Sequence, residues 1–536
     1  MPRLLRSYDL LGGDRRLILY IAYSEDKLFK DVGSRKQLFI DDDVISFVRN
    51  LTRRKHTPKK HPANPLISRS EPWEVCPQFR TSNFNVVRDG VFKAWCTDYY
   101  GYFGTAKSTW GLDSLCSRQY YMQSEDGLNW VKPPLGKHFV DGHDTNTVMG
   151  LPPYELVICP SIILDDFETD EYRRYKMAYL FKPRDVEYPK RGGSRHHGAG
   201  LSLAFSPDGI DWTVHEGNPV VPGWISDVCI LTRDPIDAKY LLFGRAGGVA
   251  GSSSHPGFDR WFPRVYPSRP EGVWGTRRRV YRLESDDGYN WSEPQLIFDP
   301  GKGDNVDDHH YGFVSWRVDD MYLGILNVLH AVDNTLDMYM MHSRDGLEWS
   351  RFQDHSPLVS RGGVGSYDEF GVETPTQPLV VGDELWFYYG GMQVHHDWWI
   401  FGQNEGLDVP EAHDPALSGN GHHLCLATLR LDGYVSLDAT LREGHVETKP
   451  VYSREPHLFI NGRCGPNGYI RAEVLDRMDN VWEGFSRDDC DPFRGDNIHH
   501  RVTWGGRVEV DGIPDSVKLR FYLKDAELYG FQFADA

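Results

Sequence analysis

Short stretches of alternating apolar and polar residues recur along the 536-residue chain, separated by turns rich in Gly, Asp and Pro. A period of two is typical of β-strands that bury one face. No long stretch follows the 3.6-residue period of an amphipathic helix. The pattern therefore predicts an all-β protein.

Four near-copies of Ser-x-Asp-Gly-x-x-Trp follow such strand-like stretches and begin at Ser124, Ser206, Ser285 and Ser343. The Asp-Gly pair favours a tight hairpin turn, because both residues tolerate the positive φ that the turn requires. Each copy is predicted to close the last hairpin of a small antiparallel sheet. A degraded fifth copy lies at 426–437.

Another hairpin, with an apolar first strand and an aromatic second strand, precedes each of the five copies. Repeated four-strand units of this size are typical of β-propeller blades. We expect a five-bladed β-propeller over residues 38–438. Short alternating strands continue after it and predict a β-sandwich over residues 439–536. Residues 1–37 are expected to form an N-terminal extension.

The formal net charge is −18, from 59 basic and 77 acidic residues. This balance repels phosphate backbones and anionic lipid, so neither nucleic acid nor a membrane is expected as a partner. The 16 Trp and 28 Tyr residues suit both packing in β structure and stacking on sugars. The aromatic count alone does not decide between these two roles, and a homo-oligomer is left open.

The eight cysteines form no Cys-x-x-Cys pair, so the sequence contains no zinc or redox motif of that kind. Cys464 and Cys490 are expected to pair only in an exported protein. The first residues show no clear signal-peptide pattern, and no apolar stretch reaches the roughly 20 residues of a membrane span. The expected location is cytoplasmic, with export left open.

Five predicted blades followed by a sandwich resemble the glycoside hydrolases of families 32 and 43, and the repeated turns resemble the Asp-box of sialidases. The resemblance begins near residue 38 and implies a glycosidase with its acids on a central axis. Arg233-Asp234-Pro235 matches a family 32 motif, but it follows its strand, so we expect a turn role for Asp234. No cofactor and no metal ligand set are predicted, although an axial calcium ion in some family 43 enzymes keeps calcium open here.

Glycoside hydrolysis needs one carboxyl group that stays protonated and a second that is ionised. The useful acids stand at the start of each blade's first strand, which faces the predicted axis. Glu74, Asp227 and Glu373 form the expected catalytic trio, with Asp368 as a further candidate. For each acid the structural alternative is a strand-start carboxylate bound to neighbouring backbone.

Aromatic and basic residues near the same strand ends or in long loops are predicted to bind substrate. The alternatives for them are core packing and surface ion pairs. The candidates are Trp224, Arg245, Trp274, Arg279, His310 and Trp398.

The predicted activity is hydrolysis of a terminal sugar from an oligo- or polysaccharide. Exo-action is expected because the long insertions at 246–276 and 395–421 would narrow an open groove to a pocket. Two alternatives remain open. One is a carbohydrate-binding propeller without catalysis, and the other is a polysaccharide lyase with His310 and Tyr311 as base and acid.

Overall fold

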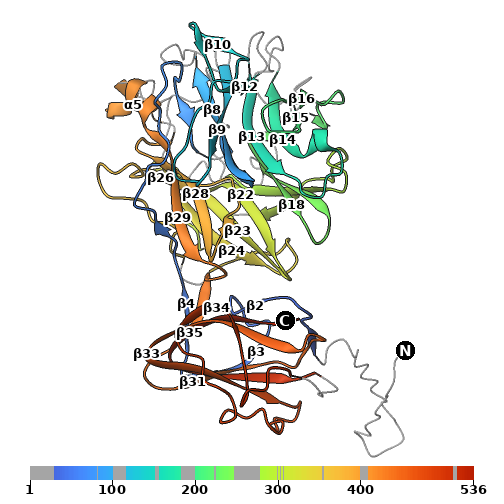
Figure 1. Ribbon diagram of the computed structural model, residues 1–536. Coiled ribbons are helices and arrows are strands. Elements are labelled where there is room, and N and C mark those ends of the chain that lie inside the picture. Colours follow the sequence, from blue (N-terminus) through green and yellow to red (C-terminus); the bar gives the residue numbers. More distant parts are fainter. Residues whose placement is uncertain are drawn as a thin grey trace, which may run out of the picture. The chain divides into compact units, whose positions relative to one another are not determined.

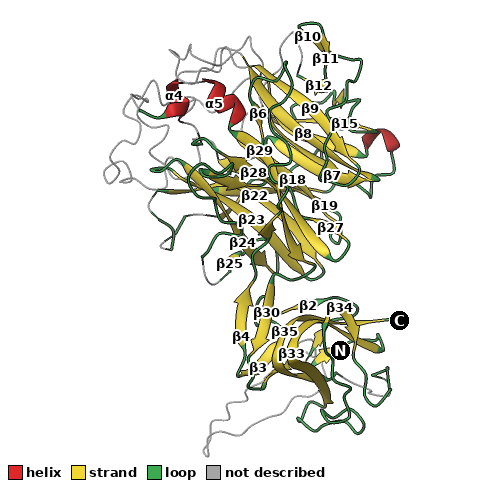
Figure 2. Cartoon of the chain, turned by 60° about the vertical axis from the view of Figure 1, so that its left-hand side comes forward, coloured by secondary structure: helices red, strands yellow, loops and turns green. Residues whose placement is uncertain are grey.

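The computed structural model divides into two compact units, Thr57–Leu429 and Met1–His56 with Arg430–Ala536. It describes residues 29–80, 82–100, 116–150, 156–182, 200–222, 225–246, 278–298, 300–301, 303–305, 307–352, 355–396, 398, 408–413, 415–510 and 516–535. These residues are almost entirely strands and turns, as the alternating pattern predicts (Figure 2). The described helices are short: η2 (Glu171–Arg173), α4 (Pro410–His413) and α5 (Pro415–Asn420).

The larger unit contains successive antiparallel strand groups, which follow one another along the chain in the colours of Figure 1. Group 1 is formed by β6 (Pro77–Gln78), β7 (Phe84–Asp89), β8 (Val91–Tyr100), β9 (Cys116–Ser124) and β12 (Thr147–Met149). Group 2 is formed by β13 (Leu156–Leu164), β14 (Tyr175–Lys182), β15 (Gly200–Ser206), β16 (Thr213–Val214) and β17 (Val221–Pro222). Group 3 is formed by β18 (Ile225–Asp234), β19 (Lys239–Ala246), β20 (Val280–Ser285) and β21 (Gln295–Phe298).

A nine-stranded sheet supplies two further groups, which a single bridge between Leu336 and Gly371 connects. Group 4 is formed by β22 (Asp308–Val318), β23 (Met321–His330), β24 (Thr335–Ser343) and β25 (Ser350–Arg351). Group 5 is formed by β26 (Gly371–Glu373), β27 (Leu379–Val381), β28 (Glu384–Met392), β29 (His422–Arg430) and β5 (Lys59–Lys60). A separate two-stranded ribbon is formed by β10 (Phe139–Val140) and β11 (His143–Asp144).

The first strands of groups 1 to 4 lie side by side in chain order, β7 next to β13, β13 next to β18 and β18 next to β22. Side chains of one group form hydrogen bonds with backbone N–H and C=O groups at the edge of the neighbouring group. Asn85 donates from Nδ2 to Pro160 O (2.8 Å) and accepts from Ile162 N–H (3.0 Å). Leu231 N–H donates to Ser161 Oγ (2.9 Å). The first strands of groups 1 and 2 thus bond to the next group without a continuous sheet, which satisfies buried polar groups that would otherwise be costly.

A second set of bonds connects consecutive groups at the opposite end of these strands. In each case a tyrosine on the second strand of one group donates its hydroxyl to an aspartate in the first hairpin turn of the preceding group. The pairs are Tyr175 with Asp89 (2.5 Å), Tyr240 with Asp165 (2.5 Å) and Tyr322 with Asp234.

Asp234 belongs to the Arg-Asp-Pro sequence, and its carboxylate also accepts hydrogen bonds from the N–H groups of Ile236 (2.9 Å) and Asp237 (3.0 Å). Burial opposes its ionisation, but the bonds from Tyr322 and from these amides outweigh burial and lower its pKa. The turn role predicted for Asp234 is confirmed.

The four Ser-x-Asp-Gly-x-x-Trp copies form one recurring turn. In the first copy, Gly127 has a φ of 74° and its N–H donates to Ser124 Oγ (2.8 Å). Asp126 accepts from two successive backbone N–H groups, and Trp130 Nε1 donates to Gly127 O (3.1 Å). The same bonds recur at the copies that begin at 206, 285 and 343. The acidic residue is therefore a turn former, which agrees with the hairpins predicted from the repeats.

The outer edge of group 5 is covered by a segment from far earlier in the chain. Strand β5 pairs with β29, and Ile67 forms a bridge with Leu424. Between these contacts, Asn64 donates from Nδ2 to Leu426 O (2.8 Å) and accepts from Leu426 N–H (2.8 Å). Residues 59–67 thus complete the last group of the unit.

The smaller unit combines strands from both parts of the chain. Its strands are β1 (Lys30–Asp31), β2 (Gln37–Leu38), β3 (Ile45–Arg49), β4 (Thr52–Lys55), β30 (Val435–Ala439), β31 (Gly444–Thr448), β32 (Val451–Tyr452), β33 (His457–Leu475), β34 (Asp496–Arg501) and β35 (Lys518–Ala534). The long strands β33 and β35 pair along most of their lengths. The first half of β35 also pairs with β31, and its second half pairs with β30 and β2.

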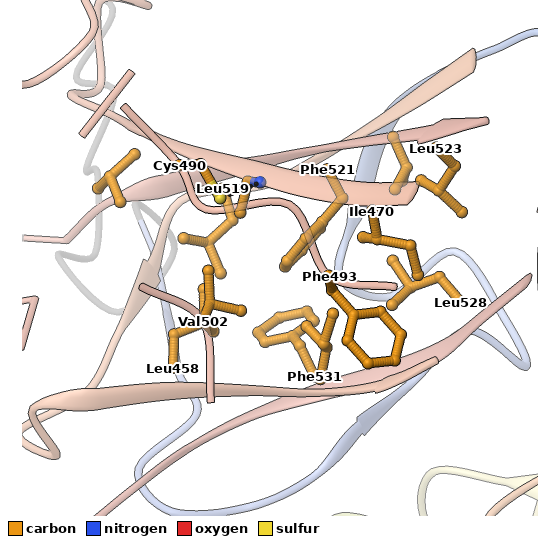
Figure 3. Packing of buried hydrophobic residues seen from close by; sticks show 14 of the residues in the cluster. Leu458, Ile470, Cys490, Phe493, Val502, Leu519, Phe521, Leu523, Leu528 and Phe531 are labelled. Atoms are coloured by element: carbon orange, nitrogen blue, oxygen red, sulfur yellow. Dashed lines mark hydrogen bonds between the residues drawn. The ribbon is translucent and has the colours of Figure 1, made fainter. Parts of the chain in front are cut away.

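Side chains from the two halves of β35 meet in one apolar core (Figure 3). Leu519, Phe521 and Leu523 point toward Leu458 and Phe531, and all five are buried. A β-sheet can cover its own face in this way where a long strand continues through a bend.

The division of the chain differs from the expected one in three respects. Residues 1–37 were expected to form a separate extension, but β1 pairs with β32 and β2 pairs with β35 of the smaller unit. Residues 430–438 were expected with the larger unit, but they belong to the smaller one. Residues 38–56 were expected with the larger unit, but β3 pairs with β31 and β4 pairs with β30, which groups them with the C-terminal strands. Backbone pairing between segments nearly 400 residues apart leaves no local pattern in the sequence.

Cys464 and Cys490 do not form a disulfide with each other. Cys464 Sγ lies near Phe493 O (3.6 Å), and Cys490 Sγ accepts from Ala472 N–H (3.2 Å). Burial raises the pKa of each thiol to about 11.

Replacing Tyr240 by Phe tests the bonds between groups. The change removes a donor from Asp165, a carboxylate with only 1% exposure, and we expect a loss of about 1–3 kcal/mol in stability. Chemical denaturation measures this loss. Tyr172→Phe, at a residue with 77% exposure, is the control and should leave the midpoint unchanged. Equal midpoints for both variants would show that the Tyr–Asp bond does not stabilise the unit.

Candidate functional site

Glu373 ends strand β26 and is completely buried. Its backbone neighbour Thr374 is held from group 4, because Asn327 Nδ2 donates to Thr374 O (2.9 Å) and Thr374 N–H donates to Asn327 Oδ1 (3.1 Å). This reciprocal pair resembles the bonds between two strands and fixes the backbone that carries Glu373. The position of the carboxylate thus depends on contacts between groups 4 and 5.

Group 1 contacts group 5 at Gly390, the residue that pairs with Glu373. Gly390 on β28 is the register partner of Glu373 and lies against the backbone of Phe79 and Arg80. A Cβ at residue 390 would lie 1.7 Å from Phe79 O, a distance that no side chain permits. Glycine is therefore required for groups 1 and 5 to meet here.

Arg80 begins a chain of polar contacts across three groups. Arg80 Nη1 lies 3.2 Å from His396 Nδ1, and the same nitrogen also donates to His396 O. His396 Nε2 lies 3.0 Å from the hydroxyl oxygen of Tyr311, near the start of β22. The guanidinium of Arg278 lies over the Tyr311 ring, 4.8 Å from its centroid. We call Arg80, Arg278, Tyr311 and His396 the Tyr311 cluster.

The surroundings of the Tyr311 cluster are poor in water. His396 and Tyr311 have exposed fractions of 3% and 7%. His422 is completely buried, and burial, with the charge of Arg80 as the next cause, holds its pKa well below the usual value of 6.5. Hydrogen bonds gain strength in such an environment.

Sequence reasoning gave no role to Arg80 or Asn327, and it considered Tyr311 only as a lyase acid. Arg80 follows the apolar sequence Cys-Pro-Gln-Phe, and His396 follows β28, so each lies at a strand end where predicted site residues were sought. The sequence does not show which strand ends lie close together in the fold.

Glu74, from the expected trio, lies in group 1 and is 1% exposed. Its carboxylate is bound by Lys132 (2.6 Å) and by the N–H groups of Ser70 (2.8 Å) and Glu71 (3.0 Å). These contacts match the structural alternative considered for a strand-start acid.

Asp368 precedes β26 but contacts the outer part of group 5. Its carboxylate is bound by Lys60 of β5 and by the hydroxyl of Tyr389 (3.1 Å). It therefore connects the covering segment 59–67 to the group.

His310 and Tyr311 are neighbours in the chain but contact different residues. His310 Nε2 lies 3.1 Å from Arg351 and 3.5 Å from Asp304. Burial opposes the charge of Asp304, but His310, Gly301 N–H and Arg351 outweigh burial and lower its pKa. The described contacts thus do not place His310 and Tyr311 at one reacting centre.

The remaining candidates are only partly described. Asp227 lies in β18 and Arg245 in β19, but their side chains, like Trp224 and Trp274, lie outside the described residues. Arg279 is 2% exposed. The Trp398 ring stacks on His395 at a centroid distance of 4.2 Å. The insertion at 246–276 is described only at residue 246, and the insertion at 395–421 only at 395–396, 398, 408–413 and 415–421.

A second polar cluster, which the sequence did not indicate, lies at the end of β23. His330 bonds to Asp308 through Nδ1 (2.7 Å) and to Asp337 through Nε2 (3.1 Å), and Arg361 donates to Asp337 (3.1 Å). Burial opposes the charged form of His330, but the two carboxylates outweigh burial and raise its pKa to about 9.

Among the described residues, no group of three or more His, Cys, Asp or Glu side chains is arranged to hold a metal ion. Calcium therefore stays a prediction from the resemblance alone. In the same part of the chain, no helix has the length and apolar character needed to cross a lipid bilayer.

No protein-family model matches the chain. No curated protein matches it either.

Several solved structures resemble the chain at low sequence identity. An N-acetylgalactosamine deacetylase from F. plautii in complex with blood group B trisaccharide has a TM-score of 0.43 at 13% identity, over 71% of this chain and 96% of that chain. A structure from the GH130 family of mannoside phosphorylases, described as containing glycoside hydrolases that target β-1,2 mannosidic linkages in Candida mannan, has a TM-score of 0.40 at 16% identity, over 70% and 94%. A family 43 arabinoxylan arabinofuranohydrolase from Bacillus subtilis in complex with cellotetraose has a TM-score of 0.38 at 13% identity, over 90% and 99%. Glycoside hydrolases are thus among the solved proteins that this chain resembles.

Gly390→Ala tests the approach of groups 1 and 5. The added methyl group would push Phe79 and Arg80 away from β28, and we expect a stability loss of about 1–3 kcal/mol. Thermal and chemical denaturation measure it. Gly363→Ala is the matched control, because nothing lies within 4 Å of a Cβ there. A Gly390 variant as stable as this control would contradict the contact.

The His330 cluster predicts a pH dependence of stability. Because the folded pKa of about 9 exceeds the ordinary 6.5, the contribution of His330 is complete below pH 6.5 and is lost as the pH rises through 9. We expect a decrease of up to about 3 kcal/mol over this window. Denaturation midpoints between pH 6 and pH 10 measure it. In the control His330→Asn this decrease should disappear, and an unchanged pH profile would contradict the assignment.

Proposed function

We propose that the chain is a glycoside hydrolase built on a five-bladed β-propeller, with strand groups 1 to 5 as its blades. The cyclic order of contacts supports this architecture: groups 1 to 4 meet through their first strands, group 5 bonds to group 4 through Asn327 and Thr374, and Gly390 returns to group 1. We likewise infer that the smaller unit is a β-sandwich, since the two halves of β35 face one core.

The observation that carries the proposed activity is the place of Glu373. It is a completely buried carboxyl group on β26, in the part of group 5 that contacts group 4 through Asn327 and group 1 through Gly390. Glycoside hydrolysis requires a protonated and an ionised carboxyl group, and removal from water is a usual means by which proteins hold the first. We assign Glu373 as one member of this pair.

We assign Asp227 as the second carboxylate. It stands near the N-terminal end of β18, which lies beside β22, and the N-terminal end of β22 carries Tyr311. Glu74 and Asp368 are then structural, because Lys132 and Lys60 neutralise them within groups 1 and 5. Exo-action stays a prediction.

Glu373→Gln tests the assignment. The amide keeps the shape but cannot transfer a proton or act as an ionised base, so we expect turnover to fall by about 100-fold or more. Release of reducing sugar from aryl-glycosides and natural oligosaccharides measures turnover. Glu369→Gln, on a half-buried residue four positions earlier, is the control with expected normal activity.

The products of the same assays distinguish the remaining alternatives. Trimming of single terminal sugars supports exo-action, whereas internal fragments contradict it. A product with a new ultraviolet absorbance would indicate a lyase, and binding without turnover would indicate a non-catalytic propeller. Equal turnover of Glu373→Gln and wild type would remove Glu373 from the mechanism.

A further inference from the structure

Asparagine side chains take the place of a strand partner at four positions among the described residues. A side-chain amide has a donor and an acceptor, as a peptide group has, so it can bond both an N–H and a C=O group of a neighbouring segment. Each of these four amides forms both bonds, at distances of 2.8 to 3.1 Å. The pairs are Asn64 with Leu426, Asn85 with Pro160 and Ile162, Asn218 with Leu203, and Asn327 with Thr374.

Asn327 differs from the other three in the residue that it holds. Its partner Thr374 directly follows Glu373, the last residue of β26. The pairing of β26 with β28 ends at Glu373, and pairing with β28 begins again only at Leu379, the first residue of β27. Asn327, from β23 of group 4, therefore supplies the backbone bonds at the point where the strand ladder of group 5 is interrupted.

Further contacts restrict the backbone of Thr374. Its Oγ1 donates to Tyr388 O (2.8 Å), and the following Pro375 disfavours helical backbone angles at Thr374. Asn327, Thr374 and Glu373 are each at most 1% exposed, so water does not replace a lost bond. The main chain that carries the Glu373 side chain is thus fixed from group 4.

We propose that Asn327 is a positioning residue, which acts through Thr374 to hold the Glu373 carboxyl group in its reactive place. The inference rests on the proposed catalytic role of Glu373. Misplacement of a reacting group by about 1 Å can cost roughly 100-fold in rate, even when the change lies outside the reacting centre. The amide of Asn327 provides the two bonds without placing a second charge near the carboxyl group, and such a like charge would disfavour its ionised form.

Asn327→Leu keeps the branched shape of the side chain and removes both bonds. We expect kcat to fall about 10- to 100-fold and KM to change by less than about threefold, because one carboxyl group moves while the rest of the site stays in place. Asn85→Leu is the matched control, since it removes the equivalent two bonds between groups 1 and 2. It should lower the thermal midpoint to a similar degree and leave kcat within about twofold of wild type. Equal losses of kcat in the two variants would overturn the positioning role.

Asn327→Asp tests the bond to Thr374 O through its dependence on pH, and it keeps the test open where Asn327→Leu does not fold. A protonated carboxyl group can still donate to this oxygen, whereas an ionised one can only accept. We expect the ratio of variant to wild-type kcat to fall about 10-fold or more from pH 5 to pH 9, measured below both unfolding transitions. Asn85→Asp, with the same substitution away from Glu373, should show no such decrease. A ratio for Asn327→Asp that does not change with pH would overturn the role of this bond.

The outcomes separate this inference from the function on which it rests. Wild-type turnover that Glu373→Gln abolishes, but that Asn327→Leu and Asn85→Leu lower equally, would overturn only the positioning role. A wild-type protein without turnover on any sugar would overturn the proposed function and this inference with it.

Discussion

The larger unit depends on how one strand group satisfies the exposed backbone edge of the next. A first strand has N–H and C=O groups on one side that no strand of its own group can bind. Asn85, Ser161 and Asn327 supply these bonds from neighbouring groups, and the Tyr–Asp pairs repeat the connection at the other ends of the strands. Loss of one such bond leaves buried polar groups unsatisfied on two groups at once.

These contacts between strand groups hold the residues of the candidate site in place. Glu373 is positioned through Thr374 and Asn327 on one side and through Gly390 on the other. Tyr311 depends on His396 and Arg80, which come from two other groups. The side chains of the site therefore keep their places only while groups 1, 4 and 5 remain in contact, so stability and the proposed chemistry share the same bonds.

The sequence predicted what is local and repetitive. Alternation predicted the strands, the Asp-Gly pairs predicted the turns, and the place of Asp234 at the far end of its strand predicted a structural role. It could not show that Lys132 neutralises Glu74 or that residues 45–55 pair with residues 435–448, because these contacts join distant segments. Glu373 and Tyr311 were recognisable as residues at strand ends. The roles of Arg80 and His396 depend on which strand ends surround them, and the sequence does not show this.

The pairing of β5 with β29, and of β3 and β4 with β31 and β30, has a consequence for biosynthesis. The segment of residues 45–67 leaves the ribosome before its partner strands, which are translated more than 350 residues later. During that interval these edges are exposed and can associate with other nascent chains. Synthesis of β29, β30 and β31 thus determines when the edges of residues 45–67 are protected from aggregation.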